Sequence, residues 1–349
     1  VQLSNILQHG GNAMGALFSA DGTRILSWGD DGTARLWDNQ SGDELRSVRH
    51  EKKRLLGAVF SRDETRILTW SKDGRARLWN KEGKPLQTLV HKRLRGARFG
   101  PNERQVLTWG NDNTARIWDV GSGQELATLI HEGWILGGLF SRTRPQVLTW
   151  SKDGTARLWR ADTGEIIVTM RHDGPVWDVV FSHDERWILT SGEDHTARLW
   201  DAASGEQLRL FAHGSRVWRG RFNQSDTKVL TRSDDGTAIL WSTVSGDQLA
   251  LLRHRGPVRG ATFSQDVRLI LTWSSDHTAR VWGLKGEGQL SSFKRIFEHQ
   301  GSVRGALFSP DGQAVLTWGD EAGARIWAIQ DGRRLTPALR HRSPINEAL

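Results

Sequence analysis

Cysteine and tyrosine are absent from this 349-residue sequence, which contains only two methionines and eight prolines. Without cysteine, the chain can form no disulfide, thiolate zinc site or iron–sulfur cluster, and it has no cysteine nucleophile. No apolar run approaches the roughly 18 residues of a transmembrane helix, and no basic and apolar leader opens the chain. These absences predict a cytoplasmic protein that makes no contact with a membrane.

The charge of the chain is positive and comes mainly from arginine. Lysine and arginine number 48 against 40 aspartates and glutamates, a formal charge of +8, and only ten of the basic residues are lysines. Such a balance favours a nucleic-acid or other polyanion partner. However, acidic residues are interleaved with the arginines and no long basic run occurs. Nucleic acid is therefore the second of the two partner classes that we consider.

One motif recurs along almost the whole chain. The string Asp-Gly-Thr-Ala-Arg-Leu-Trp occurs at 31–37 and again at 153–159. It and its close variants end, at intervals of 39 to 45 residues, at Trp37, Trp79, Trp118, Trp159, Trp200, Trp241, Trp282 and Trp327. A histidine opens each repeat, at His9, His50, His91, His131, His172, His213, His254 and His299. A ninth, His341, begins a repeat that breaks off at Leu349, so 341–349 is the start of a truncated further repeat.

Each repeat carries three or four short strand signals. In the first repeat they lie near 16–19, 24–28, 33–37 and 44–48, separated by turns rich in Gly, Asp and Ser. No segment sustains an apolar period of 3.6 residues. Short strands with turns at this spacing predict an all-β antiparallel array. The extra residues of the seventh repeat, within 283–294, are expected to form a surface loop.

These repeats resemble the WD-repeat (WD40) family, whose units of about 40 residues each form one blade of a β-propeller. The resemblance implies a single propeller domain over residues 1–349, with eight four-stranded antiparallel blades; seven blades with one loose repeat is the alternative. Because the chain begins at Val1 in mid-pattern, we expect it to be a fragment of a longer protein. Such regular arrays resemble those of bacterial multidomain regulators.

The resemblance also implies a hydrogen-bonded tetrad in each blade, made of His, Ser or Thr, Asp and Trp. The tetrads include His9, Ser27, Asp31 and Trp37; His131, Thr149, Asp153 and Trp159; and His172, Thr190, Asp194 and Trp200. The eighth repeat departs from the pattern, with Glu321 in place of aspartate. A His–Asp–Ser/Thr set also resembles a hydrolase triad, but eight copies cannot be eight active sites. With no P-loop and no H-E-x-x-H motif either, the sequence predicts neither an enzyme nor a cofactor.

An arginine stands two residues before the motif tryptophan in seven repeats. These residues are Arg35, Arg77, Arg116, Arg157, Arg198, Arg280 and Arg325, and Ile239 is the exception. Side chains two apart in a strand share a face. We therefore expect these arginines to form ion pairs or stacking contacts with a neighbouring blade.

A second regularity links two positions within a repeat. In six repeats, a tryptophan follows the tetrad Ser or Thr and a glycine stands three residues before the phenylalanine of the first strand, as with Trp28 and Gly15. A steric account explains the pairing, because an indole can lie over a strand where glycine leaves room. Repeats five and six break the rule at both positions, with Asp178 and Ser191 and with Arg219 and Arg232.

We interpret the break as a partner site, for which aromatic and arginine residues are well suited. The predicted partner-binding residues are Trp177, Asp178, Trp218, Arg219, Arg232, Arg95, Arg259 and Arg304. The alternative is drift of the repeats without any ligand. Basic loops in repeats two, three, seven and eight favour an acidic partner. The sequence thus predicts a non-catalytic scaffold or sensor that binds a protein or peptide as a monomeric domain, with a basic platform for nucleic acid as the alternative.

Overall fold

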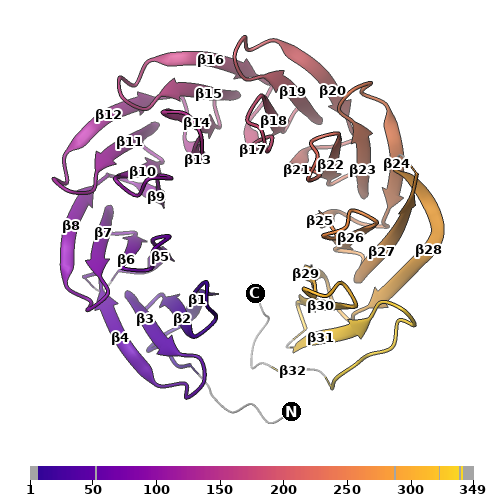
Figure 1. The fold of residues 1–349 in the computed structure, drawn as a ribbon, viewed down its shortest axis with the longest axis horizontal. Helices are drawn as coiled ribbons and strands as arrows, with labels where there is room; N and C mark the ends of the chain where they lie inside the picture. The colour runs from indigo at the N-terminus through magenta and orange to yellow at the C-terminus, as the bar shows by residue number, and fades with distance from the viewer. Residues whose placement is uncertain (1–6, 52, 287, 322, 338, 341–349) are drawn as a thin grey trace. The chain divides into compact units, whose positions relative to one another are not determined.

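The computed structural model describes residues 7–51, 53–286, 288–321, 323–337 and 339–340. Every regular element of these residues is a β-strand, and the strands form eight four-stranded sheets, each in sequence order and antiparallel (Figure 1). The predicted all-β fold of eight four-stranded blades is confirmed, and the seven-blade alternative is not. The expected further repeat at 341–349 lies outside the described residues.

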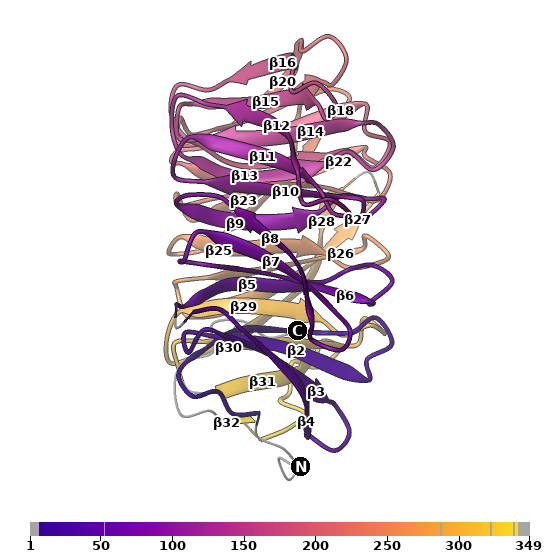
Figure 2. The same cartoon turned by 90° about the vertical axis from the view of Figure 1, so that its left-hand side faces the viewer.

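The chain divides into two compact units, residues 1–169 and 170–348, and the division falls within β16. Unit 1 holds sheets 1 to 4, which Figure 2 shows stacked one upon the next. Their strands are β1 (Ala13–Phe18), β2 (Arg24–Gly29), β3 (Thr33–Asp38) and β4 (Glu44–Arg49); β5 (Leu55–Phe60), β6 (Arg66–Ser71), β7 (Arg75–Asn80) and β8 (Pro85–Val90); β9 (Leu94–Phe99), β10 (Gln105–Gly110), β11 (Thr114–Asp119) and β12 (Glu125–Ile130); and β13 (Ile135–Phe140), β14 (Gln146–Ser151), β15 (Thr155–Arg160) and β16 (Ile166–Arg171).

Unit 2 holds sheets 5 to 8 in the same arrangement. Its strands are β17 (Val176–Phe181), β18 (Trp187–Gly192), β19 (Thr196–Asp201) and β20 (Gln207–Ala212); β21 (Val217–Phe222), β22 (Lys228–Ser233), β23 (Thr237–Ser242) and β24 (Gln248–Arg253); β25 (Val258–Phe263), β26 (Leu269–Ser274), β27 (Thr278–Lys285) and β28 (Gln289–Glu298); and β29 (Val303–Phe308), β30 (Ala314–Gly319), β31 (Gly323–Ala328) and β32 (Leu339–Arg340). Throughout the described ranges, no helix has the length and apolar character that crossing a bilayer requires.

The hydrophobic core of each unit lies between neighbouring sheets. In unit 2, Leu189 and Phe211 of sheet 5 pack with Val217, Val229 and Trp241 of sheet 6, and all five are buried. Equivalent clusters join sheets 1 and 2 and sheets 2 and 3 of unit 1. Because burying an aliphatic or aromatic side chain stabilises by about 1.5–3 kcal/mol, each sheet depends on the next one for its stability.

The turn between the second and third strands needs one residue with a positive φ. Glycine takes this place in sheet 1, where Gly32 has a φ of 77°, because a residue without Cβ adopts the left-handed region without strain. Asn113, His195 and His277 adopt φ values of 67°, 67° and 69° at the same place. The turn holds the preceding aspartate where its side chain accepts a hydrogen bond from the N–H two residues on, 3.0 Å away for Thr33 and Asp31.

Every first strand carries a β-bulge at its second residue. The pairing register between the first and second strands skips this one residue in all eight sheets, at Met14, Leu56, Arg95, Leu136, Trp177, Trp218, Arg259 and Arg304. A bulge leaves one residue unpaired and re-aims its side chain. Five of the eight predicted partner-binding residues occupy this position.

The extra residues of the seventh repeat do not form the expected loop. They lengthen β27 and β28 to 8 and 10 residues, and these strands pair as far as Lys285 and Gln289. The prediction was wrong because a two-strand extension continues an existing ladder of backbone hydrogen bonds, whereas a loop would leave those groups to water.

Candidate functional site

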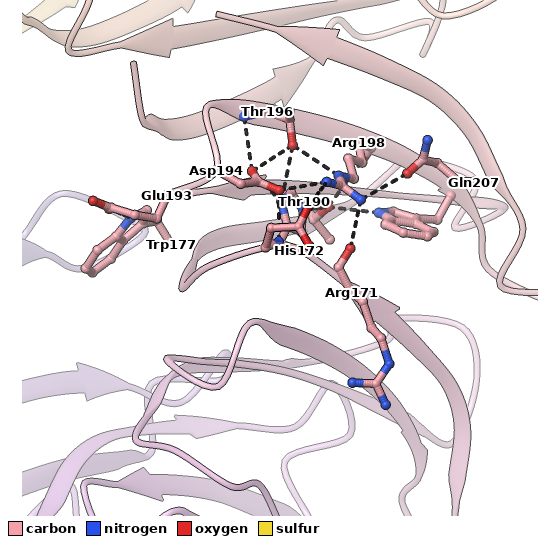
Figure 3. Close-up of polar contacts among 11 residues, drawn as sticks. Arg171, His172, Trp177, Thr190, Glu193, Asp194, Thr196, Arg198 and Gln207 are labelled. Carbon is pink, nitrogen blue, oxygen red and sulfur yellow. Dashed lines mark hydrogen bonds and ion pairs between the residues drawn. The ribbon is translucent and has the colours of Figure 1, made fainter. Parts of the chain in front are cut away.

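The tetrad of sheet 5 is a continuous hydrogen-bonded chain (Figure 3). The indole Nε1–H of Trp200 donates to the hydroxyl of Thr190, 2.8 Å away, and this hydroxyl lies 2.7 Å from Nε2 of His172. Nδ1 of His172 lies 2.9 Å from the carboxylate of Asp194. The carboxylate also accepts from the guanidinium of Arg198 at 2.7 Å. Each buried polar group therefore has a partner, which avoids a penalty of about 1–3 kcal/mol for each orphaned group.

The same arrangement recurs in all eight sheets. The Trp Nε1–H donates to the Ser or Thr oxygen over 2.7–2.9 Å. The His ring lies 2.7–2.8 Å from that same oxygen. In sheet 8, Glu321 takes the place of aspartate and contacts both His299 and Arg325. The longer glutamate thus closes the network where the sequence departs from the pattern.

Burial favours a neutral histidine in this network, and hydrogen bonds favour a charged carboxylate. Burial, together with the charge of Arg77, lowers the pKa of His50 to about 4, although Asp73 opposes the shift. Although burial raises the pKa of Asp31, hydrogen bonds from Thr33 and Gly10 bring it down to about 2. A neutral imidazole can both donate to the carboxylate and accept from the hydroxyl, as the tetrad requires. The side chains of the tetrads therefore stabilise the fold.

The motif arginines pair within their own sheet, so the expected ion pairs with a neighbouring blade are wrong. Each of the seven forms an ion pair with the tetrad acid four residues earlier, at 2.7 Å for Arg198 and Asp194 and at 2.9 Å for Arg280 and Asp276. The link to the preceding sheet is a hydrogen bond instead. Arg280 donates to the carbonyl of Arg253 at the end of β24, 2.7 Å away. The turn before the third strand places the tetrad acid beside the arginine of that strand. Residue spacing within one strand does not predict this contact.

The steric account of the Trp and Gly pairs agrees with the structure. In all six sheets that carry the pair, the two residues face each other across the first and second strands, as Gly260 faces Trp273. A Cβ at these six glycines would lie only 1.9–2.3 Å from Cζ2 of the paired indole. The tryptophan therefore covers the strand only because no side chain stands there.

Sheets 5 and 6 fill this position differently and bring four predicted residues into contact. Asp178 faces Ser191 and Arg219 faces Arg232 across the corresponding strand pairs. Nε and one terminal nitrogen of Arg219 donate to the two carboxylate oxygens of Asp178, each over 3.2 Å, and so join β21 to β17. The rings of Trp177 and Trp218, at the two bulges, have their centroids 4.9 Å apart.

Three polar side chains surround the two indoles. The guanidinium of Arg216 lies over the ring of Trp218, 5.1 Å from its centroid, and forms ion pairs with Asp234 and Glu193. Glu193 also accepts a 2.7 Å hydrogen bond from Nε1 of Trp177 (Figure 3). Both indoles stay partly exposed. Offset aromatic and cation–π contacts hold the rings in place without burying them.

A comparison with protein families decides what kind of protein this is. The model of the IFT122 first β-propeller matches residues 13–283, well over half of the chain. The chain belongs to this WD40 β-propeller family. WD40 propellers generally mediate protein–protein interactions and generally act as non-catalytic scaffolds.

Solved structures give the same fold for this propeller. The crystal structure of the computationally designed Ika8 protein has a TM-score of 0.71 at 24% identity, over 93% of this chain and 99% of Ika8. The C-terminal WD40 domain of Sif2 has a TM-score of 0.70 at 20% identity, over 88% of this chain and 93% of that domain. At these identities the likeness shows the fold alone. Sequence comparison with curated proteins gave no match.

A fifth predicted partner-binding residue joins the four that sheets 5 and 6 bring into contact, and the other three lie elsewhere. Arg232 stands opposite Arg219 and donates to the carbonyl of Val258 at the start of β25, 3.3 Å away. Arg259 and Arg304, at the bulges of sheets 7 and 8, contact Ser275 and Asp320 respectively. Arg95 is exposed at the bulge of sheet 3, in unit 1. The structure thus brings together Trp177, Asp178, Trp218, Arg219 and Arg232, which we call the Trp–Arg cluster.

Sequence reasoning missed several members of this surface. Glu193 and Arg216, which contact Trp177 and Trp218, were not among the predicted partner-binding residues, and neither was Asp234, which forms an ion pair with Arg216. Arg221, two residues beyond Arg219 on β21, was missed as well. Its position could have indicated it. Arg221 stands two residues after Arg219, which replaces the glycine of the rule, and side chains two apart in a strand share a face.

Proposed function

We propose that this propeller is a non-catalytic platform that binds a protein or peptide partner at the Trp–Arg cluster. The observation that carries the proposal is the joint departure of two adjacent sheets from the Trp and Gly rule, which creates a half-exposed aromatic pair beside a bidentate ion pair. Binding by a single copy of the chain, in the cytoplasm, is part of the proposal.

The fold does not require the Trp–Arg cluster. Six other sheets of the same propeller fill the equivalent space with an indole over glycine, with no charged residue at either position. Placing Asp178 and Arg232 there costs desolvation that the indole avoids. Because the fold does not need these charged residues, the desolvation cost of burying them supports a role in binding.

The residue types suit the centre of a protein interface. Tryptophan and arginine carry most of the binding energy in such interfaces, where they fill pockets and exclude water. The contact between Trp177 and Trp218 fixes both rings before a partner arrives, so little rotamer freedom is lost on binding.

Truncating Trp218 tests the proposal. With Trp218→Ala, the affinity for the partner should fall by about 2 kcal/mol or more, roughly 30-fold, because a hot-spot indole is lost. The partner would be captured from extract of the source cell with the wild-type chain, and its dissociation constant would then be measured by calorimetry against each variant.

The matched control is Arg157→Ala, which removes a scaffold arginine that pairs with Asp153. This variant should lose stability and keep the partner affinity. If Trp218→Ala keeps both its fold and its full affinity, the Trp–Arg cluster is not the site and the break in the rule is drift.

A further inference from the structure

The Trp–Arg cluster and its neighbour Arg221 hold more positive charge than their own acids balance. Asp178 pairs with Arg219 through both carboxylate oxygens. Neither Arg221 nor Arg232 has an ion-pair partner in the part of the chain that the structure describes. Arg232 makes a single hydrogen bond, to the Val258 carbonyl. Two guanidinium charges are therefore without an opposite charge of their own.

The strand register places these charges close together. Arg219 and Arg232 stand directly opposite each other in the β21–β22 pair, where like charges are destabilising. Beyond the bulge, the strand returns to regular alternation, so Arg221 shares a face with Arg219. Three guanidinium groups thus gather around one buried carboxylate.

The ionisation of the group reflects this crowding. Burial, together with the charges of Arg219 and Arg221, lowers the pKa of Arg232 to about 10. Burial and Arg219 also lower the pKa of Arg221. An added negative charge at this place would relieve the repulsion between the cations.

Two neutral polar groups beside the cations also lack partners. Among the described residues, the indole Nε1 of Trp218 and the hydroxyl of Ser191 are buried without a hydrogen-bond partner. Buried polar groups in native proteins are nearly always hydrogen-bonded. The surroundings of the three arginines therefore contain unused donors as well as unpaired positive charge.

We propose that a carboxylate of the partner binds against Arg221 and Arg232, so that the partner presents an acidic peptide segment to this surface. The inference rests on the proposed function, since it assigns the chemistry of the same site. An apolar side chain next to the carboxylate packs on Trp177 and Trp218. Asp178, Glu193 and Asp234 repel a long uniform polyanion, which favours a peptide with one or two acids over nucleic acid.

Selection of peptides from a random display library, with the full chain as bait, tests this inference. The selected peptides should be enriched in Asp or Glu next to an apolar residue. Their dissociation constants, measured by fluorescence anisotropy with labelled copies, should rise at least tenfold for Arg221→Gln, which keeps most of the side-chain length but removes the charge. Far-ultraviolet circular dichroism and urea midpoints would show that the variant is folded.

The matched control is Arg253→Gln. Arg253 is exposed at the end of β24 and also has no ion pair among the described residues, and its replacement should change the affinity less than twofold. The selected peptides could instead lack acidic residues and lose affinity with Trp218→Ala but not with Arg221→Gln. This result would overturn the inference of a bound carboxylate and leave the proposed function intact. Duplex DNA that displaces the peptides and depends on Arg221 would overturn the inference in favour of a polyanion. Peptides whose dissociation constants do not change with Trp218→Ala would overturn the proposed function itself.

Discussion

Replacing Asp194 with alanine should lower the free energy of unfolding by about 3–5 kcal/mol. The side chain of Asp194 is only 6% exposed and accepts from His172, Thr196 and Arg198. Although burial raises the pKa of Asp194, hydrogen bonds from His172 and Thr196 hold it well below the usual range. The substitution would leave the Arg198 guanidinium and the His172 ring without their shared acceptor. Removing one member of a buried pair costs more than the pair itself contributes.

Asp173→Ala is the matched control for this prediction. Asp173 lies in the same repeat and also approaches Arg198, at 3.8 Å, but its side chain is 94% exposed. Exposed ion pairs contribute about 1 kcal/mol or less, so the control should lie close to the wild type. Urea denaturation gives both free energies. Equal midpoints for the two variants, with unchanged m-values, would contradict a stabilising role for the tetrad acid.

Acidification should begin to destabilise the protein near pH 6.5, above the pH at which ordinary carboxylates protonate. Burial lowers the pKa of His50 and of His254 to about 4, against an ordinary value of 6.5. The unfolded chain therefore binds more protons than the folded chain between pH 6.5 and 4, and stability falls as the pH falls through this window. For each of these two histidines, the preference of the unfolded chain for the protonated ring should lower the free energy of unfolding by on the order of 3 kcal/mol between pH 6.5 and 4. Burial also lowers the pKa of His9, His91, His131 and His299.

The free energy of unfolding, measured by urea titration at half-unit steps from pH 7.5 to 4, tests this account. The slope against pH should steepen below pH 6.5. In His254→Asn the side chain cannot be protonated in this range, so the slope should shrink by about one proton, 1.36 kcal/mol per pH unit. A free energy that stays constant down to pH 4 would show that His50 and His254 are not buried in their neutral form.

The sequence was sufficient to predict the fold because the same motif recurs in eight repeats. Each motif Trp marks a third strand and each opening His precedes a first strand, and the glycines under Trp28 and its counterparts follow from sterics within one sheet. Local alternation of side chains and turn chemistry decide such features. They need no knowledge of how one sheet meets the next.

Contacts that depend on turns and bulges could not be predicted in the same way. Within sheet 5, the ion pair of Arg198 with Asp194 depends on the tight turn, in which His195 has a positive φ. The contact of Trp177 with Trp218 depends on two bulges, 41 residues apart in sequence. The pattern predicted that positions 178 and 219 would matter, but only the structure shows that Asp178 and Arg219 bond to each other. A bulge re-aims a side chain by an amount that sequence spacing does not give.

The most direct test of the account restores the rule that sheets 5 and 6 break. The fourfold substitution Asp178→Gly, Ser191→Trp, Arg219→Gly and Arg232→Trp recreates in both sheets the Trp over Gly pair that six other sheets use, and it leaves no buried carboxylate without its arginine. Because this pair closes those sheets without any buried charge, the variant should match or exceed the wild type in urea denaturation. Its affinity for the selected peptides should fall at least tenfold, since it loses two arginines and the ion pair between Asp178 and Arg219. Full affinity in a stably folded variant would contradict the claim that the departure from the rule is a binding site.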